Sequence, residues 1–104
     1  MSDAQRFQMV VAEVQAARQQ AAALNAQLKE IESSIKAIDE QPENLALHRQ
    51  IGGILVEVKD RDSLKKELEE NLETLSAHSA RMQDHEKELM ATYELLKKSL
   101  EGSN

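Results

Sequence analysis

The chain has 104 residues and a formal net charge of −6, and it contains one Phe, one Tyr, no Trp and no Cys. This length allows a single domain, the scarcity of large rings argues against a compact globular core, and the lack of cysteine excludes disulfides and thiolate chemistry. The sequence shows no signal peptide and no run of about 20 apolar residues that could span a membrane, so we expect a cytoplasmic protein. It also shows no stripe of basic residues, which a nucleic-acid binder would need.

The first predicted element is a helical arm over residues 3–41. Counting in alternating steps of three and four gives an apolar residue at every position, as in a coiled-coil seam. The seam consists of Phe7, Val10, Val14, Ala17, Ala21, Leu24, Leu28, Ile31, Ile35 and Ile38. Ser2 and Gln5 have capping-box spacing, and Pro42 ends the arm because it has no N–H to donate.

The second predicted element is a β-hairpin over residues 45–58, centred on Gly52 and Gly53. Two glycines favour a two-residue turn with positive φ, and the β-branched run 54–58 favours a strand. In this register Ile51 lies opposite Ile54 and His48 opposite Glu57. The expected apolar residues of the hairpin, called the hairpin surface below, are Leu47, Ile51, Gly52, Gly53, Ile54, Leu55, Val56 and Val58.

The third predicted element is a helical arm over residues 62–101 with the same spacing. Its seam consists of Leu68, Leu72, Leu75, Ser79, Met82, Glu86, Leu89, Tyr93, Leu96 and Leu100. Asp60, Asp62 and Ser63 are candidate N-caps, and Gly102 suits the C-terminal end. If the arms fold back antiparallel, Leu68 lies near Ile35 and Leu96 near Phe7. The polar positions Ser79 and Glu86 then face Leu24 and Ala17.

A two-stranded hairpin is marginal in water and has two unpaired edges. Because the seams of the arms already cover each other, we expect the hairpin to pair with hairpins of other chains in a shared sheet or barrel. The alternative is a hairpin that packs against the base of its own arms.

The order of arm, hairpin containing "IGGILVE" and matching second arm resembles a β-class prefoldin subunit over the whole chain. The hairpin is the specific part: its motif is most similar to the second subunit of eukaryotic prefoldins, and archaeal β subunits are similar. The resemblance implies one prefoldin-like domain over 1–104 with a mainly α fold. This fold is a long antiparallel two-helix coiled coil with a central β-hairpin that joins an intermolecular β-barrel.

The resemblance also implies a hexamer of two α-class and four β-class subunits. This family captures non-native polypeptides at the coiled-coil tips and delivers them to a group II chaperonin without nucleotide or another cofactor. Apolar residues near the free arm ends are therefore the expected client contacts, and we call them the tip residues. They are Phe7, Met9, Val10, Val11, Val14, Met90, Tyr93 and Leu96.

Other functions fit the sequence less well. A coiled-coil scaffold or tether remains the alternative, although a scaffold has no need for apolar residues outside the seam, such as Met9, Val11 and Met90. The alternative for these three residues is that they belong to a ragged end of the seam or contact a neighbouring arm.

Membrane-surface binding would need basic residues beside the apolar face. His78 and His85 are about 10 Å apart along a helix, too far to share one metal ion. No phosphate loop or nucleophile motif is present, so neither an enzyme nor a membrane or nucleic-acid partner is expected.

Overall fold

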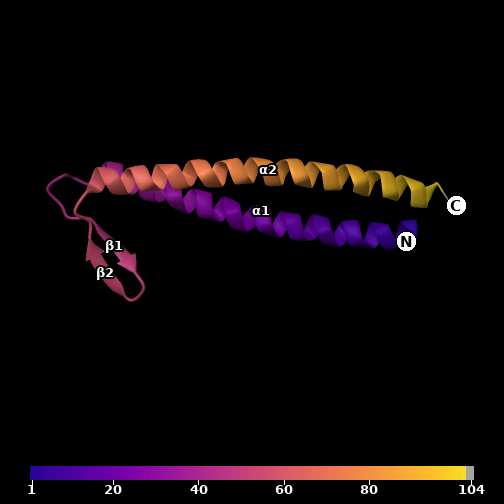
Figure 1. The fold of residues 1–104 in the computed structure, drawn as a ribbon, viewed down its shortest axis with the longest axis horizontal. Coiled ribbons are helices and arrows are strands. Elements are labelled where there is room, and N and C mark those ends of the chain that lie inside the picture. Colours follow the sequence, from indigo (N-terminus) through magenta and orange to yellow (C-terminus); the bar gives the residue numbers. More distant parts are fainter. Residues whose placement is uncertain (103–104) are drawn as a thin grey trace. The chain divides into compact units, whose positions relative to one another are not determined.

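The computed structural model describes residues 1–102 and contains two long helices joined through a short antiparallel hairpin (Figure 1). The elements are α1 (Asp3–Glu40), β1 (His48–Ile51), β2 (Ile54–Glu57) and α2 (Arg61–Glu101). The predicted mainly helical, coiled-coil-like fold with one hairpin is confirmed. The helices begin and end within one residue of the expected bounds, and the two strands lie between residues 48 and 57 of the expected span 45–58.

Local capping explains where the helices begin. The Gln5 amide donates to the Ser2 hydroxyl at 3.2 Å and the Ser2 amide donates to the Gln5 side chain at 3.0 Å, which is a reciprocal capping box. At the start of α2, the Ser63 amide donates to Asp60 Oδ1 at 3.0 Å, so Asp60 is the N-cap among the three candidates.

The heptad spacing identified the packed face of both helices. All twenty predicted seam positions are buried or half-buried, including the polar residues Ser79 and Glu86. Exposed residues occupy most of the remaining helical positions. The alternating three-and-four spacing thus describes the face that each helix turns toward the other.

The chain divides into two compact units. Unit 1 combines Met1–Asn25 with Ala77–Asn104, and unit 2 is Ala26–Ser76. In unit 1, Val10, Val14, Ala17 and Leu89 form a buried cluster against which Met90, Tyr93 and Leu96 pack. In unit 2, Ile38 is the buried hydrophobic residue.

Cross-helix contacts within each unit agree with the expected antiparallel register to within one helical turn. In unit 1 the Ser99 hydroxyl donates to Asp3 Oδ2 at 2.9 Å, and in unit 2 Lys65 Nζ lies 2.7 Å from Asp39 Oδ1. The largest departure is at Phe7, which was expected beside Leu96. Its ring instead stacks on Tyr93, one turn away, with centroids 5.2 Å apart, an arrangement that aromatic pairs favour.

Candidate functional site

The hairpin has the expected register. Arg49 pairs with Val56, Gln50 with Leu55 and Ile51 with Ile54. The Val58 amide donates to the Leu47 carbonyl at 2.8 Å, which extends the pairing by one step. Gly52 has φ +61° and Gly53 has no positive φ; this is the sign pattern of a type II′ turn, since type I′ needs positive φ at both positions.

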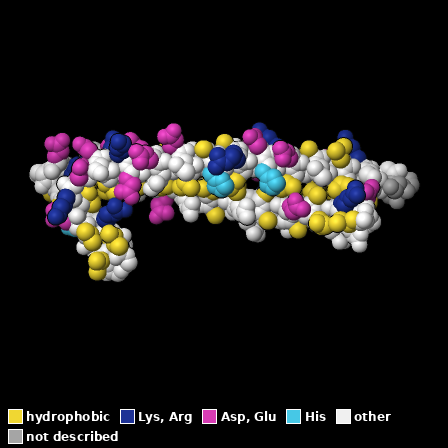
Figure 2. Space-filling model, in the orientation of Figure 1, with side chains coloured by type: hydrophobic (Ala, Val, Ile, Leu, Met, Phe, Trp, Pro, Cys, Tyr) yellow, Lys and Arg dark blue, Asp and Glu magenta, His cyan; other side chains and the backbone are white. Residues whose placement is uncertain are grey.

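Every residue of β1 and β2 is exposed in the chain. Leu55 is 70% exposed and Ile54 is 64% exposed. Hydrophobic side chains are visible over much of the hairpin (Figure 2). Of the predicted hairpin surface, only Leu47 and Val58, at its base, are half-buried. The hairpin therefore carries apolar side chains on both faces that the rest of unit 2 does not cover.

The connector between α1 and the hairpin is held by Arg61, at the first position of α2. Its guanidinium donates to the carbonyls of Gln41, Pro42 and Leu45 at 2.7, 3.1 and 3.1 Å. Arg49 Nη1 lies 3.5 Å from Glu67 Oε2, so β1 also contacts α2 within unit 2. Neither contact was expected from the sequence, because both join residues far apart in the chain.

All eight tip residues lie in unit 1, but their side chains differ in exposure. Val10 and Val14 are 8% and 6% exposed and belong to the helix–helix core, so their side chains face the partner helix. Met9 is 50% exposed, and the other five are half-buried. Leu95, which is 71% exposed, is a further large apolar side chain of this surface outside the seam.

Among the shallow grooves of unit 1, two are lined by residues of both helices. We call the first groove A; it is lined by Phe7, Val11, Val14, Gln15, Arg18, Met90 and Tyr93. The second is called groove B, and it is lined by Met1, Arg6, Met9, Val10, Glu13, Thr92 and Leu96. Arg18 is the single charged residue of groove A, whereas groove B has one charge of each sign.

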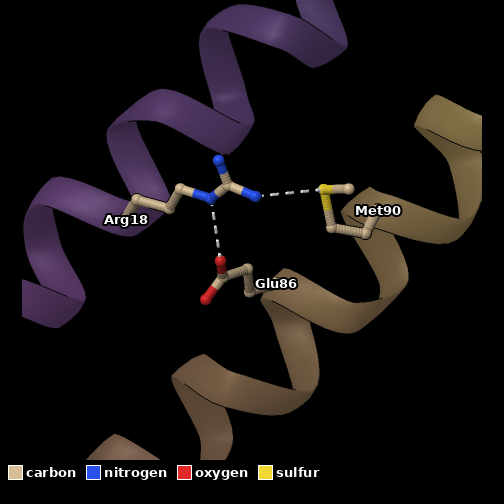
Figure 3. A network of polar contacts seen from close by, with 3 residues as sticks. All are labelled: Arg18, Glu86 and Met90. Atoms are coloured by element: carbon tan, nitrogen blue, oxygen red, sulfur yellow. Dashed lines mark hydrogen bonds and ion pairs between the residues drawn. The ribbon is translucent and has the colours of Figure 1, made fainter.

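Arg18 is the residue of this surface that sequence reasoning missed. Its Nε lies 3.2 Å from Glu86 Oε1, and its Nη2 lies 3.8 Å from the sulfur of Met90 (Figure 3). Glu86, a polar residue at a seam position, thus pairs with an arginine that directly follows the seam residue Ala17. The sequence did contain a signal for this pair. Glu86 was expected to face Ala17, and the residue after Ala17 carries the opposite charge.

No helix among residues 1–102 is long and apolar enough to cross a membrane. Over the same residues, no group of three or more His, Asp or Glu side chains is placed to hold a metal ion.

The comparisons with known proteins agree with this architecture. A family model described as "Prefoldin subunit" matches residues 2–103. No curated protein matches the chain significantly. The crystal structure of the prefoldin beta subunit from Thermococcus strain KS-1 is similar with a TM-score of 0.84 and 20% identity, over 97% of this chain and 88% of that one.

A second similar structure is the prefoldin beta2 subunit from Thermococcus strain KS-1. It has a TM-score of 0.74 and 24% identity, over 93% of this chain and 99% of that one. At these identities the two structures support the fold, and the family model supports the family. The family model covers nearly the whole chain, and the two long helices with one exposed hairpin fit it, so this chain belongs to the prefoldin subunit family.

Proposed function

We propose that this co-chaperone subunit captures non-native polypeptides through the exposed tip residues of unit 1 and assembles with other prefoldin subunits through its hairpin. The proposed assembly is a cytoplasmic hexamer of α-class and β-class subunits whose hairpins form a β-barrel. It passes its clients to a group II chaperonin without a chemical step of its own. The scaffold function remains the alternative, and the experiments below separate the two.

The distribution of exposed large hydrophobic side chains carries the proposal. Among the described residues they lie in only two regions. One region is the hairpin with its preceding connector, and the other is unit 1. They are Leu45, Ile51, Ile54, Leu55 and Val56 in the first region, and Met1, Met9 and Leu95 in the second. Contiguous exposed apolar side chains on a protein surface typically mark interaction sites.

The chemistry of each region fits a different partner. The hairpin offers free strand edges together with β-branched side chains, which suit pairing with another strand. Unit 1 offers flexible methionines beside an aromatic pair, which suit many apolar partners of different shape. One buried side chain contributes about 1.5–3 kcal/mol, so one chain holds a client weakly, and several chains in one complex hold it reversibly through multivalency.

Assembly is tested by native mass spectrometry of the chain, alone and mixed with an α-class prefoldin subunit. We expect a hexamer in the mixture, and loss of that hexamer with Ile54→Asp, because a charge on the exposed apolar strand opposes its burial between chains. Gln50→Ser, on the facing strand, is the matched control and should assemble normally. A hexamer that forms equally well with Ile54→Asp would contradict a role of the hairpin in assembly.

Client capture is tested by light scattering of an aggregating unfolded protein in the presence of the assembled complex. We expect the double variant Met9→Ser/Leu95→Ser to assemble but to lose most of the suppression of aggregation, since both side chains are largely exposed. Gln8→Ser, at the exposed polar residue that precedes Met9 on α1, is the control. Full suppression by the double variant would remove the tip from the mechanism, and a wild-type complex that suppresses nothing would favour the scaffold.

A further inference from the structure

Groove A differs from the rest of the proposed capture surface in its charge. Apolar side chains of Phe7, Val11, Met90 and Tyr93 line it, and Arg18 is its only charged residue. The groove has a volume of about 310 Å³, at the small end of ligand sites, so it takes only a few side chains at a time. The charge of Arg18 beside this groove therefore acts on the client residue that is adjacent to the one whose side chain enters the groove.

The guanidinium of Arg18 is oriented by contacts that leave part of it available. Nε lies against Glu86 and Nη2 against the sulfur of Met90, while the other terminal nitrogen points away from both partners (Figure 3). The side chain of Arg18 is 60% exposed, and that of Glu86 is 28% exposed. A guanidinium carries five N–H donors, so both terminal nitrogens keep donors that a second carboxylate can accept.

The wider charge of unit 1 does not oppose an acidic client. Unit 1 has seven acidic and six basic residues, whereas unit 2 has twelve acidic and seven basic residues. The net charges are thus −1 and −5, and together they account for the −6 of the chain. A carboxylate that approaches unit 1 therefore meets a surface whose net charge is close to zero.

We propose that Arg18 is a specificity-determining residue of the tip, which makes groove A prefer non-native segments with an Asp or Glu next to a large apolar residue. The apolar side chain enters the groove and the neighbouring carboxylate accepts hydrogen bonds from the terminal nitrogens of Arg18. Glu86 holds the guanidinium in place and also competes for it. This inference rests on the proposed capture function, and it adds a charge preference to an otherwise apolar surface.

Fluorescence anisotropy of labelled peptides on the assembled complex tests the inference. Three peptides share a Leu-Phe centre and differ in one adjacent residue, which is Asp, Asn or Lys. We expect the wild-type complex to bind the Asp peptide about three- to tenfold more tightly than the Asn peptide. The Lys peptide should bind no better than the Asn peptide, and the ratio should fall as salt is added.

Three variants separate specificity from a structural role. Arg18→Gln should remove the preference for the Asp peptide, so that the Asp and Asn peptides bind with equal affinity. Glu86→Gln should increase the preference, because Arg18 then has no internal carboxylate. Arg81→Gln, which makes the same charge change on α2 in unit 1, is the control and should keep the wild-type ratio.

The outcomes distinguish this inference from the function on which it rests. Equal binding of the Asp and Asn peptides by the wild-type complex would overturn the role of Arg18 and leave apolar capture intact. Equal weakening of every peptide by Arg18→Gln would also overturn it, since that pattern indicates a structural role. If no peptide binds the wild-type complex, the proposed capture function fails and the inference fails with it.

Discussion

Gly52 is the described residue whose backbone most clearly requires glycine. Its φ of +61° lies in the left-handed region, where a Cβ is disfavoured, although a Cβ at either glycine of the turn would meet nothing within 4 Å. The two glycines therefore differ in backbone conformation and not in the space available for a Cβ.

This difference predicts unequal effects of two alanine substitutions. Gly52→Ala should destabilise the hairpin by about 1–2 kcal/mol, because alanine pays the left-handed penalty. Gly53→Ala should be close to neutral, since neither space nor a positive φ opposes it. Hydrogen exchange of the hairpin amides measures both. Equal loss of protection in the two variants would contradict the type II′ turn.

Lys65 provides a pH-dependent contact in unit 2. The hydrogen bond from Lys65 to Asp39 Oδ1, together with the negative charge of Asp39, raises the pKa of Lys65 above its ordinary value. A raised folded-state pKa stabilises the fold at pH values below the unfolded pKa. That stabilisation is lost as the pH rises through the folded pKa.

We therefore expect Asp39→Asn to lower Tm slightly at neutral pH, by an amount that shrinks as the pH rises through the pKa of Lys65. The effect is small because both side chains are partly exposed. Thermal melts of wild type and variant over neutral to alkaline pH measure the difference. Glu32→Gln, an exposed carboxylate on α1, is the control. A difference that stays constant with pH would show that the Lys65 contact contributes nothing.

At the scale of the elements, α1 and α2 pack through a seam that includes a small residue, Ala17, among larger ones. Ala17 is buried in unit 1 beside Val14 and Leu89, whereas its neighbour Ala16 is exposed. The same residue type thus occupies two adjacent positions that differ only in the face they occupy.

Ala17→Leu should destabilise the chain by about 1–3 kcal/mol, because a larger side chain overpacks the helix–helix contact. Ala16→Leu should change the free energy of unfolding by less than about 0.5 kcal/mol, since it adds a good helix former on the exposed face. Urea denaturation followed by circular dichroism compares the two. If both variants lose stability equally, the seam has been assigned to the wrong face.

The connector between α1 and the hairpin depends on Arg61. Arg61→Ala should destabilise unit 2 by about 1–2 kcal/mol, because three backbone carbonyls lose a charged donor and the bond to Gln41 is partly buried. Arg61→Lys should recover only part of this, because an ammonium carries all its donors on one nitrogen, whereas Arg61 reaches the three carbonyls from two nitrogens. Denaturant midpoints measure both variants against Arg81→Ala, an exposed arginine of α2. A full recovery with lysine would mean that charge alone matters.

At the scale of the whole molecule, the core of the chain by itself is small. The buried hydrophobic residues are Val10, Val14, Ala17, Leu24, Ile38 and Leu89, and no described side chain falls below 2% exposure. A core of this size gives modest stability. Burial of the hairpin in an assembly would add the largest remaining apolar area.

Thermal stability should therefore depend on concentration. Mixed with an α-class subunit, the wild-type chain should lose several degrees of Tm on a hundredfold dilution, because association stabilises only the folded state. Ile54→Asp should melt lower and at a temperature independent of concentration. Differential scanning calorimetry at two concentrations measures this. A wild-type Tm that does not change on dilution would argue that the hairpin needs no partner chain.

The amino-acid sequence by itself determined the helices, the seam and the hairpin register, because these depend on local periodicity, capping and turn chemistry. The seam from Phe7 to Ile38 and the pairing of Ile51 with Ile54 follow from spacing alone. Helical and strand periods are properties of neighbouring residues, so a single sequence is enough to find them.

Only the tertiary structure decided how far the apolar residues outside the seam are covered and which charges meet. Val11 and Met90 lie outside the seam, as Met9 does, yet they are half-buried whereas Met9 is 50% exposed. The pairing of Arg18 with Glu86, and of Arg61 with the carbonyls of residues 41, 42 and 45, joins positions distant in the chain. Such contacts depend on the rotation and offset of one helix against another, which local spacing constrains only to within a turn.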